Sequence, residues 1–311
     1  MSQELAVTTV HADRGDPILR FISPMAPIRT ILKHRELLGQ LARREVVGRY
    51  RGSYLGVFWA LLTPLMTLAV FSLVFGTIHN NKWAKTARID QPQHQVASDS
   101  PSIKPHAPSP LEFPMNMFIG IIMFGIFSEV ATRAAVLITA NPNFVKKAVF
   151  PLELLGVSVA IGSVVHALMT LAIELLFVWI VQGYVPLTAL LLPVVFIPAF
   201  LLTLGVCWAL GAMGVFFRDL GQAVGPVVQL MFFLTPIVYS MKAFDSTPTA
   251  GKYLRMFNPF VTIVENARLL LIDGEMPDWG ALAMVTVVSG VVAMIGYIIF
   301  MKVRRYFADA M

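Results

Sequence analysis

The chain has 311 residues, of which 57% are hydrophobic and only 14% are charged. Soluble globular domains average roughly 45–50% apolar and about 25% charged residues, so this composition argues against a water-soluble protein and excludes disordered and collagen-like chains. An apolar run of about 18 or more residues suits a helix that crosses the bilayer core. Stretches longer than this that carry no charge include 53–78, 175–217, 220–241 and 279–301. We therefore predict an all-α polytopic membrane protein.

Cysteine content and net charge add two limits. Cys207 is the only cysteine and sits in an apolar run, so the chain can form neither an intrachain disulfide nor a thiolate zinc site. The formal net charge is +6. In a membrane chain an excess of Lys and Arg marks cytoplasmic loops, so we expect no nucleic-acid partner.

A basic, partly apolar segment precedes the first long apolar run. At 3.6 residues per turn, four of its apolar residues fall within an arc of about 100°, and three charged residues interrupt that face. The apolar set is Ile31, Leu38, Leu41 and Ala42, and the interrupting set is Arg35, Glu45 and Arg49. The pattern predicts an amphipathic interface helix over 29–52, with a solvated charged helix as the alternative.

Six membrane spans are predicted within a transmembrane domain over 53–302. Fifteen of the 24 Lys and Arg residues then fall on the side of the two termini and eight on the opposite side, with Arg133 inside a span. This bias places both termini in the cytoplasm. The segments 1–28 and 303–311 become cytoplasmic tails, the first one flexible and without the apolar core of a signal peptide. The spans are about 53–78, 114–138, 153–181, 187–216, 221–241 and 280–301.

The predicted extracytoplasmic loop 79–112 is rich in proline and poor in large apolar residues. It can bury little surface to offset its ordering entropy, so we predict that it is flexible. Three histidines in this loop, His79, His94 and His106, are widely spaced and have no Cys or carboxylate at metal-ligand spacing. We expect solvated histidines and no metal site.

The loop between the second and third spans combines aromatic and cationic residues between prolines. Asn141 suits a helix cap, Pro142 suits the first helical position, and Pro151 would end the helix. The pattern predicts a surface helix of about two turns. Such a helix could dock into a cleft on a soluble partner or anchor the loop in lipid headgroups. Four side chains would make that contact: Phe144, Lys146, Lys147 and Phe150.

A second unusual segment, 244–279, is expected on the outer side. Asn258 and Pro259 resemble a cap and first turn, and the following stretch is too short to span and carries Glu265 and Arg268. Half-length helices at membrane depth occur only where protein or a water-filled cavity covers their ends. We predict a re-entrant helix beside an outer pore mouth, with an amphipathic helix lying on the surface as the alternative.

Ionisable residues inside the spans are few. Glu129 and Arg133 stand four apart and could neutralise each other on one helix face, and Glu174 has no obvious local partner. These three are either structural or polar points on a translocation path. Arg218 and Asp219, at the inner end of the fourth span, are expected to form an ion pair or a helix end.

Aromatic residues are plentiful, among them Phe58 and Trp59 at the start of the first span. Sugar rings stack on aromatic faces, so a glycan conduit is one interpretation, and lipid contact or helix packing is the other. The chain has no P-loop, no nucleotide-binding fingerprint and no recognisable hydrolytic motif. If it does work, a separate subunit is expected to supply the ATP.

Several short motifs follow one another along the chain. They are 49–56 (Arg-Tyr-Arg-Gly-Ser-Tyr-Leu-Gly) running into Phe58-Trp59 and Thr63-Pro64, then 141–151, 216–220 (Phe-Phe-Arg-Asp-Leu), 235–237 (Thr-Pro-Ile) and 258–260 (Asn-Pro-Phe). This ordered set resembles the permease subunits of ABC exporters for lipid-linked polysaccharide or polyol phosphate. The resemblance covers about residues 35–305. The loop 79–112 departs from that family, whose corresponding loop is usually much shorter.

This resemblance implies a homodimer of permeases joined to two copies of a separate cytoplasmic ATPase that binds ATP and magnesium, with no cofactor in this chain. It implies export of O-antigen, capsule or teichoic acid chains across the bacterial cytoplasmic membrane, with envelope proteins as further candidate partners. It also implies that 141–151 is the coupling helix, that the 29–51 helix lies at the cytoplasmic interface, and that 244–279 forms gate helices at the outer face.

Two other functions stay open from the residues alone. One is a drug or small-lipid exporter of the same ABC class. The other is an integral membrane glycan-processing enzyme, which would need carboxylates or histidines that converge near an interface. Asp273, Glu275 and Asp278 crowd one outer loop, and we expect them to be solvated turn residues.

Overall fold

Within the described residues every regular element is a helix and no strand is present, as the composition predicts. Most of the predicted N-terminal tail and of the predicted loop 79–112, with its three histidines, lies outside them. The computed structural model describes residues 23, 25–50, 58–78, 111–145, 150–244 and 247–310.

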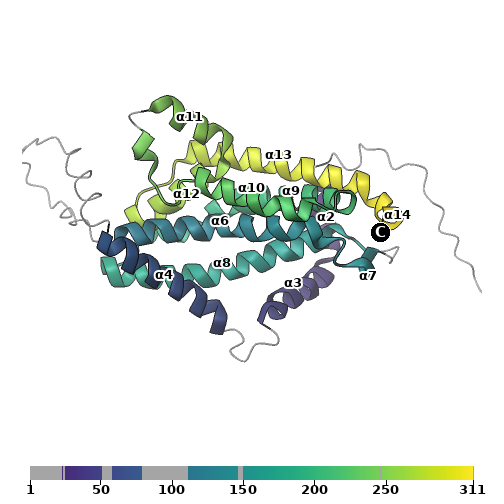
Figure 1. The fold of residues 1–311 in the computed structure, drawn as a ribbon, viewed down its shortest axis with the longest axis horizontal. Helices are drawn as coiled ribbons and strands as arrows, with labels where there is room; N and C mark the ends of the chain where they lie inside the picture. Colours follow the sequence, from purple (N-terminus) through teal and green to yellow (C-terminus); the bar gives the residue numbers. More distant parts are fainter. Residues whose placement is uncertain are drawn as a thin grey trace, which may run out of the picture.

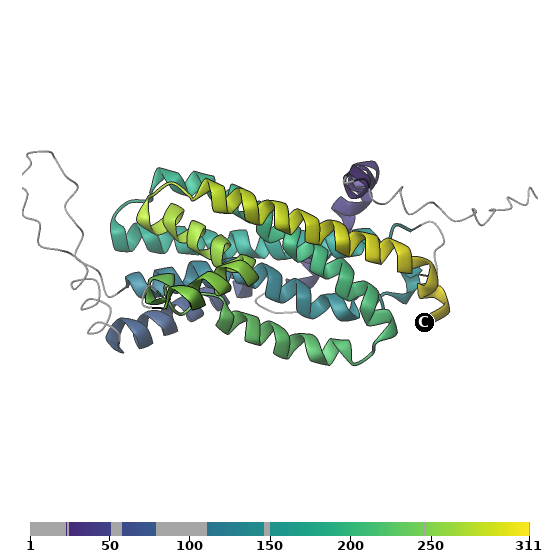
Figure 2. The same cartoon turned by 90° about the horizontal axis from the view of Figure 1, so that it is seen from above.

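Four long apolar helices form the frame of the molecule and run side by side along its long axis (Figures 1 and 2). Their bounds match the predicted spans to within two residues, except that α9 begins at Leu192 and the short turn before it fills the predicted span from Leu187. With that turn included, each is long and apolar enough to cross a bilayer. The long helix that begins at Glu153 ends at Gly183, whose left-handed φ of 82° is common for a glycine that caps a helix. The frame helices are α6 (Glu112–Leu137), α8 (Glu153–Gln182), α9 (Leu192–Phe216, preceded by the turn η1, Leu187–Leu191) and α13 (Trp279–Val303).

Glycines allow the backbones of α6, α9 and α13 to approach closely. A Cβ atom added at Gly214 of α9 would overlap the carbonyl oxygen of Ala135 on α6. A Cβ at Gly205 would lie 2.6 Å from backbone atoms of Ala293, and one at Gly296 would overlap the carbonyl oxygen of Gly205. Small residues at such crossings are typical of helix packing in membranes. Helix α9 is therefore clamped between α6 and α13.

Two further apolar helices, α4 (Phe58–Ile78) and α10 (Leu220–Leu234), lie against this frame. The predicted span 221–241 was too long. Helix α10 ends at Leu234 because Pro236 disfavours helical backbone at the residue before it, and Thr235 is extended with ψ of 137°. By length and composition the described residues contain four helices that could span and two shorter apolar ones, so six spans remain a proposal.

The predicted interface helix is two helices. Helix α2 (Met25–Lys33) and helix α3 (Arg35–Tyr50) are separated by a turn at His34, whose ring nitrogen Nδ1 lies 3.2 Å from the carbonyl oxygen of Thr30. A single continuous helix over 29–52 was therefore wrong. Leu38 and Leu41 of α3 are buried against the frame, as the apolar arc predicts.

The loop after α6 contains only one described helical turn, α7 (Pro142–Val145), where about two turns were expected. Residues 146–149 lie outside the described segments, so the rest of that helix stays a prediction. The chain closes at the same end of the molecule with the turn η4 (Arg304–Tyr306) and helix α14 (Phe307–Ala310) (Figure 1). We call this end the α7 end.

The opposite end holds the region between α10 and α13, and we call it the α12 end. Asn258 caps α12 and Pro259 occupies its first position, which confirms the predicted helix start. Helix α11 projects from the side of the bundle (Figure 1). The elements in order are η2 (Met241–Phe244), α11 (Pro248–Phe257), α12 (Pro259–Arg268) and the π-helical turn η3 (Leu269–Asp273).

Buried side chains divide into two apolar clusters, one toward each end. The first packs α12 and η3 among α6, α8 and α9, and includes Phe124, Phe127 and Phe260. The second packs α3 against α8, α9 and α13, and includes Trp208 and Tyr297. The N-terminal helices therefore rest on one cluster and the half-length helix α12 on the other.

Candidate functional site

An aromatic contact marks the surface of the α7 end. The rings of Phe144 and Phe150 stack with centroids 4.4 Å apart and 26° between their planes. The guanidinium carbon of Arg44 on α3 lies 5.2 Å from the centroid of Phe144, within cation–π range. Both rings are partly exposed. The structure therefore joins two phenylalanines of the predicted coupling helix and ties them to α3, while Lys146 and Lys147 lie outside the described residues.

Asn141 acts on the preceding helix. Its side-chain amide donates to the carbonyl oxygen of Leu137, 2.9 Å away, at the end of α6. The last carbonyls of a helix have no intrahelical partner, so the Asn141 side chain satisfies the end of α6. Its backbone carbonyl accepts from the N–H of Phe144 in α7 at 3.1 Å, and a side-chain cap of α7 stays a prediction.

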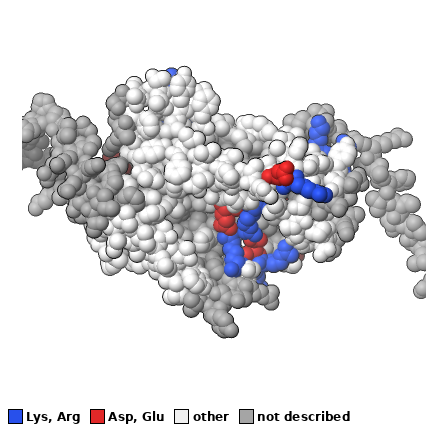
Figure 3. Space-filling view, viewed as in Figure 1, with Lys and Arg blue, Asp and Glu red and all other residues white. Residues whose placement is uncertain are grey.

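Four charged side chains meet where α3 crosses α6 and α8, and we call them the charge quartet: Glu45, Arg49, Glu129 and Arg133. Between the helices, Arg49 pairs with Glu129, and Arg133 Nη2 lies 2.5 Å from Glu45 Oε1. Within each helix, Glu45 pairs with Arg49 at 3.8 Å and Glu129 with Arg133 at 3.4 Å. Ser163 of α8 donates to Glu129 Oε2 at 3.1 Å. Figure 3 shows blue and red side chains side by side on this otherwise mostly white face.

The sequence predicts two of the four residues of the charge quartet. The pair between Glu129 and Arg133 is present as expected, but its main partners come from α3. Glu45 and Arg49 lie at the centre of the apolar arc of that helix, where they seemed to interrupt it. Charges on a buried face call for partners, and this was the signal that sequence reasoning left unused.

A cavity of about 620 Å³ lies beside the quartet, between α4, α6 and α8. Its walls are mostly apolar. Trp59, one of the two aromatic residues singled out in the sequence, lines it, and Phe58 does not; both side chains are exposed. Polar lining residues come from all three helices and from the end of α3: Arg49, Thr63, Glu129, Ser163, His166 and Thr170.

Glu174 lies on α8, on the same helix face as Ser163 and Thr170. Its side chain is fully buried, and neither carboxylate oxygen has a hydrogen-bond partner among the described residues. It lies outside the lining of the cavity between α4, α6 and α8. The structure thus separates Glu174 from Glu129 and Arg133, with which the sequence grouped it.

Arg268 fixes α12 to two other parts of the α12 end. Its guanidinium donates to the carbonyl oxygens of Asn116 and Ile237, both at 2.9 Å, and to that of Tyr239 at 3.4 Å. Burial lowers the pKa of Arg268 to about 10, and Glu265 opposes that shift. The guanidinium therefore stays protonated at neutral pH and holds three carbonyl groups.

Two asparagines complete this arrangement. Asn258 accepts from the backbone N–H of Phe260 at 3.0 Å, and its amide donates to the hydroxyl of Thr235 at 2.9 Å. The side-chain oxygen of Asn266 accepts from the backbone N–H of Asp278 at 2.8 Å. Helix α12 is thus attached to the end of α10, the start of α6 and the start of α13.

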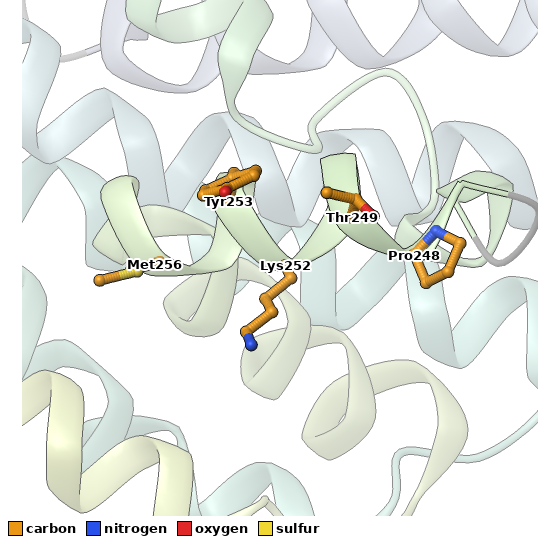
Figure 4. A pocket seen from close by; sticks show the side chains of 5 residues that line it. All are labelled: Pro248, Thr249, Lys252, Tyr253 and Met256. Carbon is orange, nitrogen blue, oxygen red and sulfur yellow. The ribbon is translucent and has the colours of Figure 1, made fainter.

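Helix α11 is attached more loosely. Arg255 pairs with Glu265 of α12 at 3.2 Å, and Arg255 is more than half exposed. Burial raises the pKa of Glu265, and Arg255 offsets part of that rise. Aromatic side chains on α11, Tyr253 and Phe257, stack with centroids 6.3 Å apart and are exposed. A shallow pocket of about 430 Å³ follows α11 (Figure 4), lined by Pro248, Thr249, Lys252, Tyr253 and Met256.

The remaining candidates are exposed turn residues. Arg218 and Asp219 form the turn between α9 and α10, and Asp219 occupies the N-cap position of α10, which confirms the predicted helix end. No ion pair between the two is among the contacts of the described residues. Asp273, Glu275 and Asp278 are exposed, and Asp278 caps α13 by accepting from the N–H of Ala281. The described residues contain no group of three or more His, Cys, Asp or Glu that could hold a metal ion.

The chain is similar in sequence to several known membrane transport proteins. The chain is 26% identical over 283 residues to the O-antigen export system permease protein RfbA of Myxococcus xanthus. The aligned residues make up 91% of this chain and 98% of that relative. It is 24% identical over 276 residues to RfbA of Klebsiella pneumoniae, covering 88% and 94%. It is 23% identical over 251 residues to the polysialic acid transport protein KpsM of Escherichia coli, covering 79% and 86%.

The sequence profile of the membrane domain of ABC-2 type transporters matches residues 36–272. That range begins in α3 and runs through all the elements up to η3. It includes the charge quartet, residues 141–151 around α7, which we call the α7 segment, and α12. It covers well over half of the chain. The protein is therefore a multi-pass membrane protein that belongs to the ABC-2 type transporter family.

Proposed function

We propose that this chain is the membrane-spanning permease subunit of an ATP-driven exporter that moves a lipid-linked polysaccharide of the O-antigen, capsule or teichoic acid type. The observation that carries the proposal is the match to a permease named for O-antigen export along nearly its whole length. Two relatives named for polysialic acid transport support the broader class of polysaccharide.

The proposed docking site for the ATPase is the α7 segment, residues 141–151. Its stacked Phe144 and Phe150 give it apolar knobs that fit a cleft on a soluble partner, and Lys146 and Lys147 would add positive charge. The chain has no nucleotide-binding motif of its own. Two copies of a separate subunit would therefore bind ATP and magnesium and push on this segment.

A second copy of this chain completes the proposed permease. Helices α4 and α10 expose apolar side chains that need cover from lipid or protein in a membrane. With α4 and α10 counted as spans, six helices would cross the bilayer. The surplus of basic residues on the side of the termini supports a cytoplasmic α7 end. We propose the bacterial cytoplasmic membrane as the location. The exposed residues include Leu65, Val70 and Leu73 on α4, and Val227, Leu230 and Phe233 on α10.

The substrate path is proposed to follow α4, α6 and α8. Trp59 offers an aromatic face for sugar rings at the cavity between these helices, and Phe58 lies one residue before it. At the α12 end, we place the moving part of the outer gate in α11. Helix α12, with Asn258 and Arg268, would be its fixed support, because those side chains bond it to three neighbouring elements.

The test is Phe144→Asp in full-length protein that is expressed with its ATPase. Replacing an aromatic ring by a carboxylate removes the stacking on Phe150 and the cation–π contact with Arg44. We expect the ATPase to stop co-purifying in mild detergent and surface polysaccharide to disappear. Asn143→Asp is the matched control, since it adds the same charge to an exposed neighbour and leaves both rings in place. Unchanged export with Phe144→Asp would overturn the proposal.

The same cells test the substrate class. Depletion of this protein should cause lipid-linked polymer to accumulate inside the cell. Drug sensitivity with normal surface polysaccharide would instead indicate a drug or small-lipid exporter of the same family. A glycan-processing enzyme would be indicated if combined substitution of Asp273, Glu275 and Asp278 abolished polymer synthesis.

A further inference from the structure

The charge quartet is partly buried, and it differs from an isolated ion pair because every charge in it has two partners. Each of the four charges has one partner on the other helix and one on its own helix, four residues away. Breaking a buried pair is costly when it leaves a charge alone. If α3 moved away from α6, Glu45 would keep Arg49 and Glu129 would keep Arg133. The contact between the helices can therefore open without leaving an unpaired charge.

The fit of α3 against α8 also depends on one small residue. A Cβ atom added at Gly162 of α8 would lie 2.7 Å from Glu45 Cγ and 3.2 Å from Arg49 Nη2. Any other residue type there would force these side chains to shift. The two α3 members of the quartet are thus seated in a recess on α8.

Helix α3 carries a second contact directly beside the quartet. Arg44, the residue before Glu45, holds its guanidinium over the Phe144 ring of the α7 segment. One helix therefore touches the proposed ATPase docking segment with one residue and the membrane helix α6 with the next. Displacement of Phe144 would act on α3 close to its ion pairs.

The quartet also borders the cavity between α4, α6 and α8. Arg49 and Glu129, which pair with each other, both line that cavity. Ser163, which donates to Glu129, lines it as well. A shift of α3 would therefore change the shape of the cavity between α4, α6 and α8.

We propose that the charge quartet is a reversible latch that holds α3 against α6 and α8, and that it must open in each transport cycle. This rests on the proposed function, because the force that opens it would come from an ATPase docked on the α7 segment. A merely structural contact would stay closed throughout the cycle. The two possibilities differ in what happens when the contact is made permanent.

A reversible disulfide makes it permanent. The ideal Cβ position at Gly162 lies 3.6 Å from the Cβ of Glu45, which is within the range for a disulfide, about 3.5–4.5 Å. We would combine Gly162→Cys with Glu45→Cys in a Cys207→Ala background. The complex with its ATPase would be studied in intact cells, with surface polysaccharide as the readout and copper phenanthroline as the oxidant.

We expect oxidation to join α3 to α8 and to lower export at least tenfold relative to the same double variant before oxidation, and reduction to return export to that starting level. Each single cysteine variant should be insensitive to oxidant. Undiminished export with the disulfide formed would overturn the latch, since a permanent contact would then be compatible with transport. Absence of a disulfide under oxidation would also overturn it, because α3 would not lie on α8 in the membrane.

Charge exchange supplies a second variant. Arg133→Glu should place three carboxylates around Arg49 and weaken the contact between α3 and α6. Adding Glu45→Arg puts both positive charges on α3 and both negative charges on α6, so the attraction between the helices becomes stronger than in the natural chain. We expect the single variant to raise the ATPase rate of the purified complex without export, and the double variant to lower that rate at least threefold. Equal rates in both would contradict the latch.

The outcomes separate the latch from the proposed function. If Phe144→Asp abolishes ATPase binding while the disulfide leaves export unchanged, the permease function stands and the latch fails. If Phe144→Asp leaves the ATPase bound, the docking proposal fails. The latch proposal then fails too, because the ATPase would have no contact through which to open it.

Discussion

The two ends of the molecule use polar side chains in opposite ways. At the α7 end, the quartet joins side chain to side chain, and each charge has an alternative partner. At the α12 end, Arg268 bonds three backbone carbonyls, and Asn258 and Asn266 each bond a backbone N–H. Backbone groups cannot rotate away, so one end is built for a fixed geometry and the other for exchange.

The largest effect should come from the helix frame that both ends share. Gly214→Ala would place a methyl group on the carbonyl oxygen of Ala135, and overpacking that cannot relax costs about 3 kcal/mol or more. We expect loss of the monodisperse peak in size-exclusion chromatography. Gly290→Ala on α13 is the control, because its added methyl group meets nothing within 4 Å and alanine favours helix by about 1 kcal/mol.

The next prediction compares one arginine from each end. Arg268→Leu leaves buried carbonyls without a donor and should cost about 3 kcal/mol, seen as a lower thermal unfolding temperature in detergent. Arg133→Leu should cost less than about 1 kcal/mol, because Arg133 is 39% exposed and Glu45 keeps Arg49 as a partner. Equal losses for the two variants would remove the contrast between the ends.

Asn258→Ala tests how much the cap of α12 contributes to the stability of the α12 end. It removes a helix cap and the bond to Thr235, which should cost about 1–2 kcal/mol. Asn143→Ala, on the exposed surface of α7, should leave the unfolding temperature unchanged. If Asn258→Ala were equally silent, α12 would not depend on its cap.

The smallest effect is expected where α11 meets α12. Arg255→Leu breaks its ion pair with Glu265, but the side chain of Arg255 is 57% exposed, and such surface pairs contribute less than about 1 kcal/mol. Stability should barely change. A large loss of stability would mean that α11 is a fixed part of the α12 end and not a loosely attached helix.

Much of the frame could be predicted because its signals are local. Long apolar runs with few charges, bounded by Pro, Gly or charge, gave α6, α8 and α13 to within two residues, and gave the end of α9. The cap at Asn258 was predictable for the same reason. The overlong fifth span was avoidable, since Pro236 stands in the sequence and acts on the residue before it.

The quartet could be predicted only in part because its partners are distant in sequence. Helical spacing shows that Glu129 and Arg133 share a face, and that Glu45 and Arg49 share one on α3. No pattern of neighbouring residues indicates that these two helix faces contact each other. The same holds for Arg268, whose three acceptors are backbone carbonyls of α6 and of the turn after α10. Carbonyl groups carry no residue signature, so this role has no sequence pattern.

The proposal that an ATPase works through the α7 segment can be tested most directly by cross-linking. Asn143→Cys in a Cys207→Ala background places a thiol on the exposed surface of α7. With a bifunctional thiol reagent we expect a cross-link to the co-expressed ATPase that changes in yield when ATP is added. Met276→Cys, exposed at the α12 end, should give none. A cross-link from Met276→Cys, or none from Asn143→Cys in a complex that still exports polysaccharide, would contradict docking at this segment.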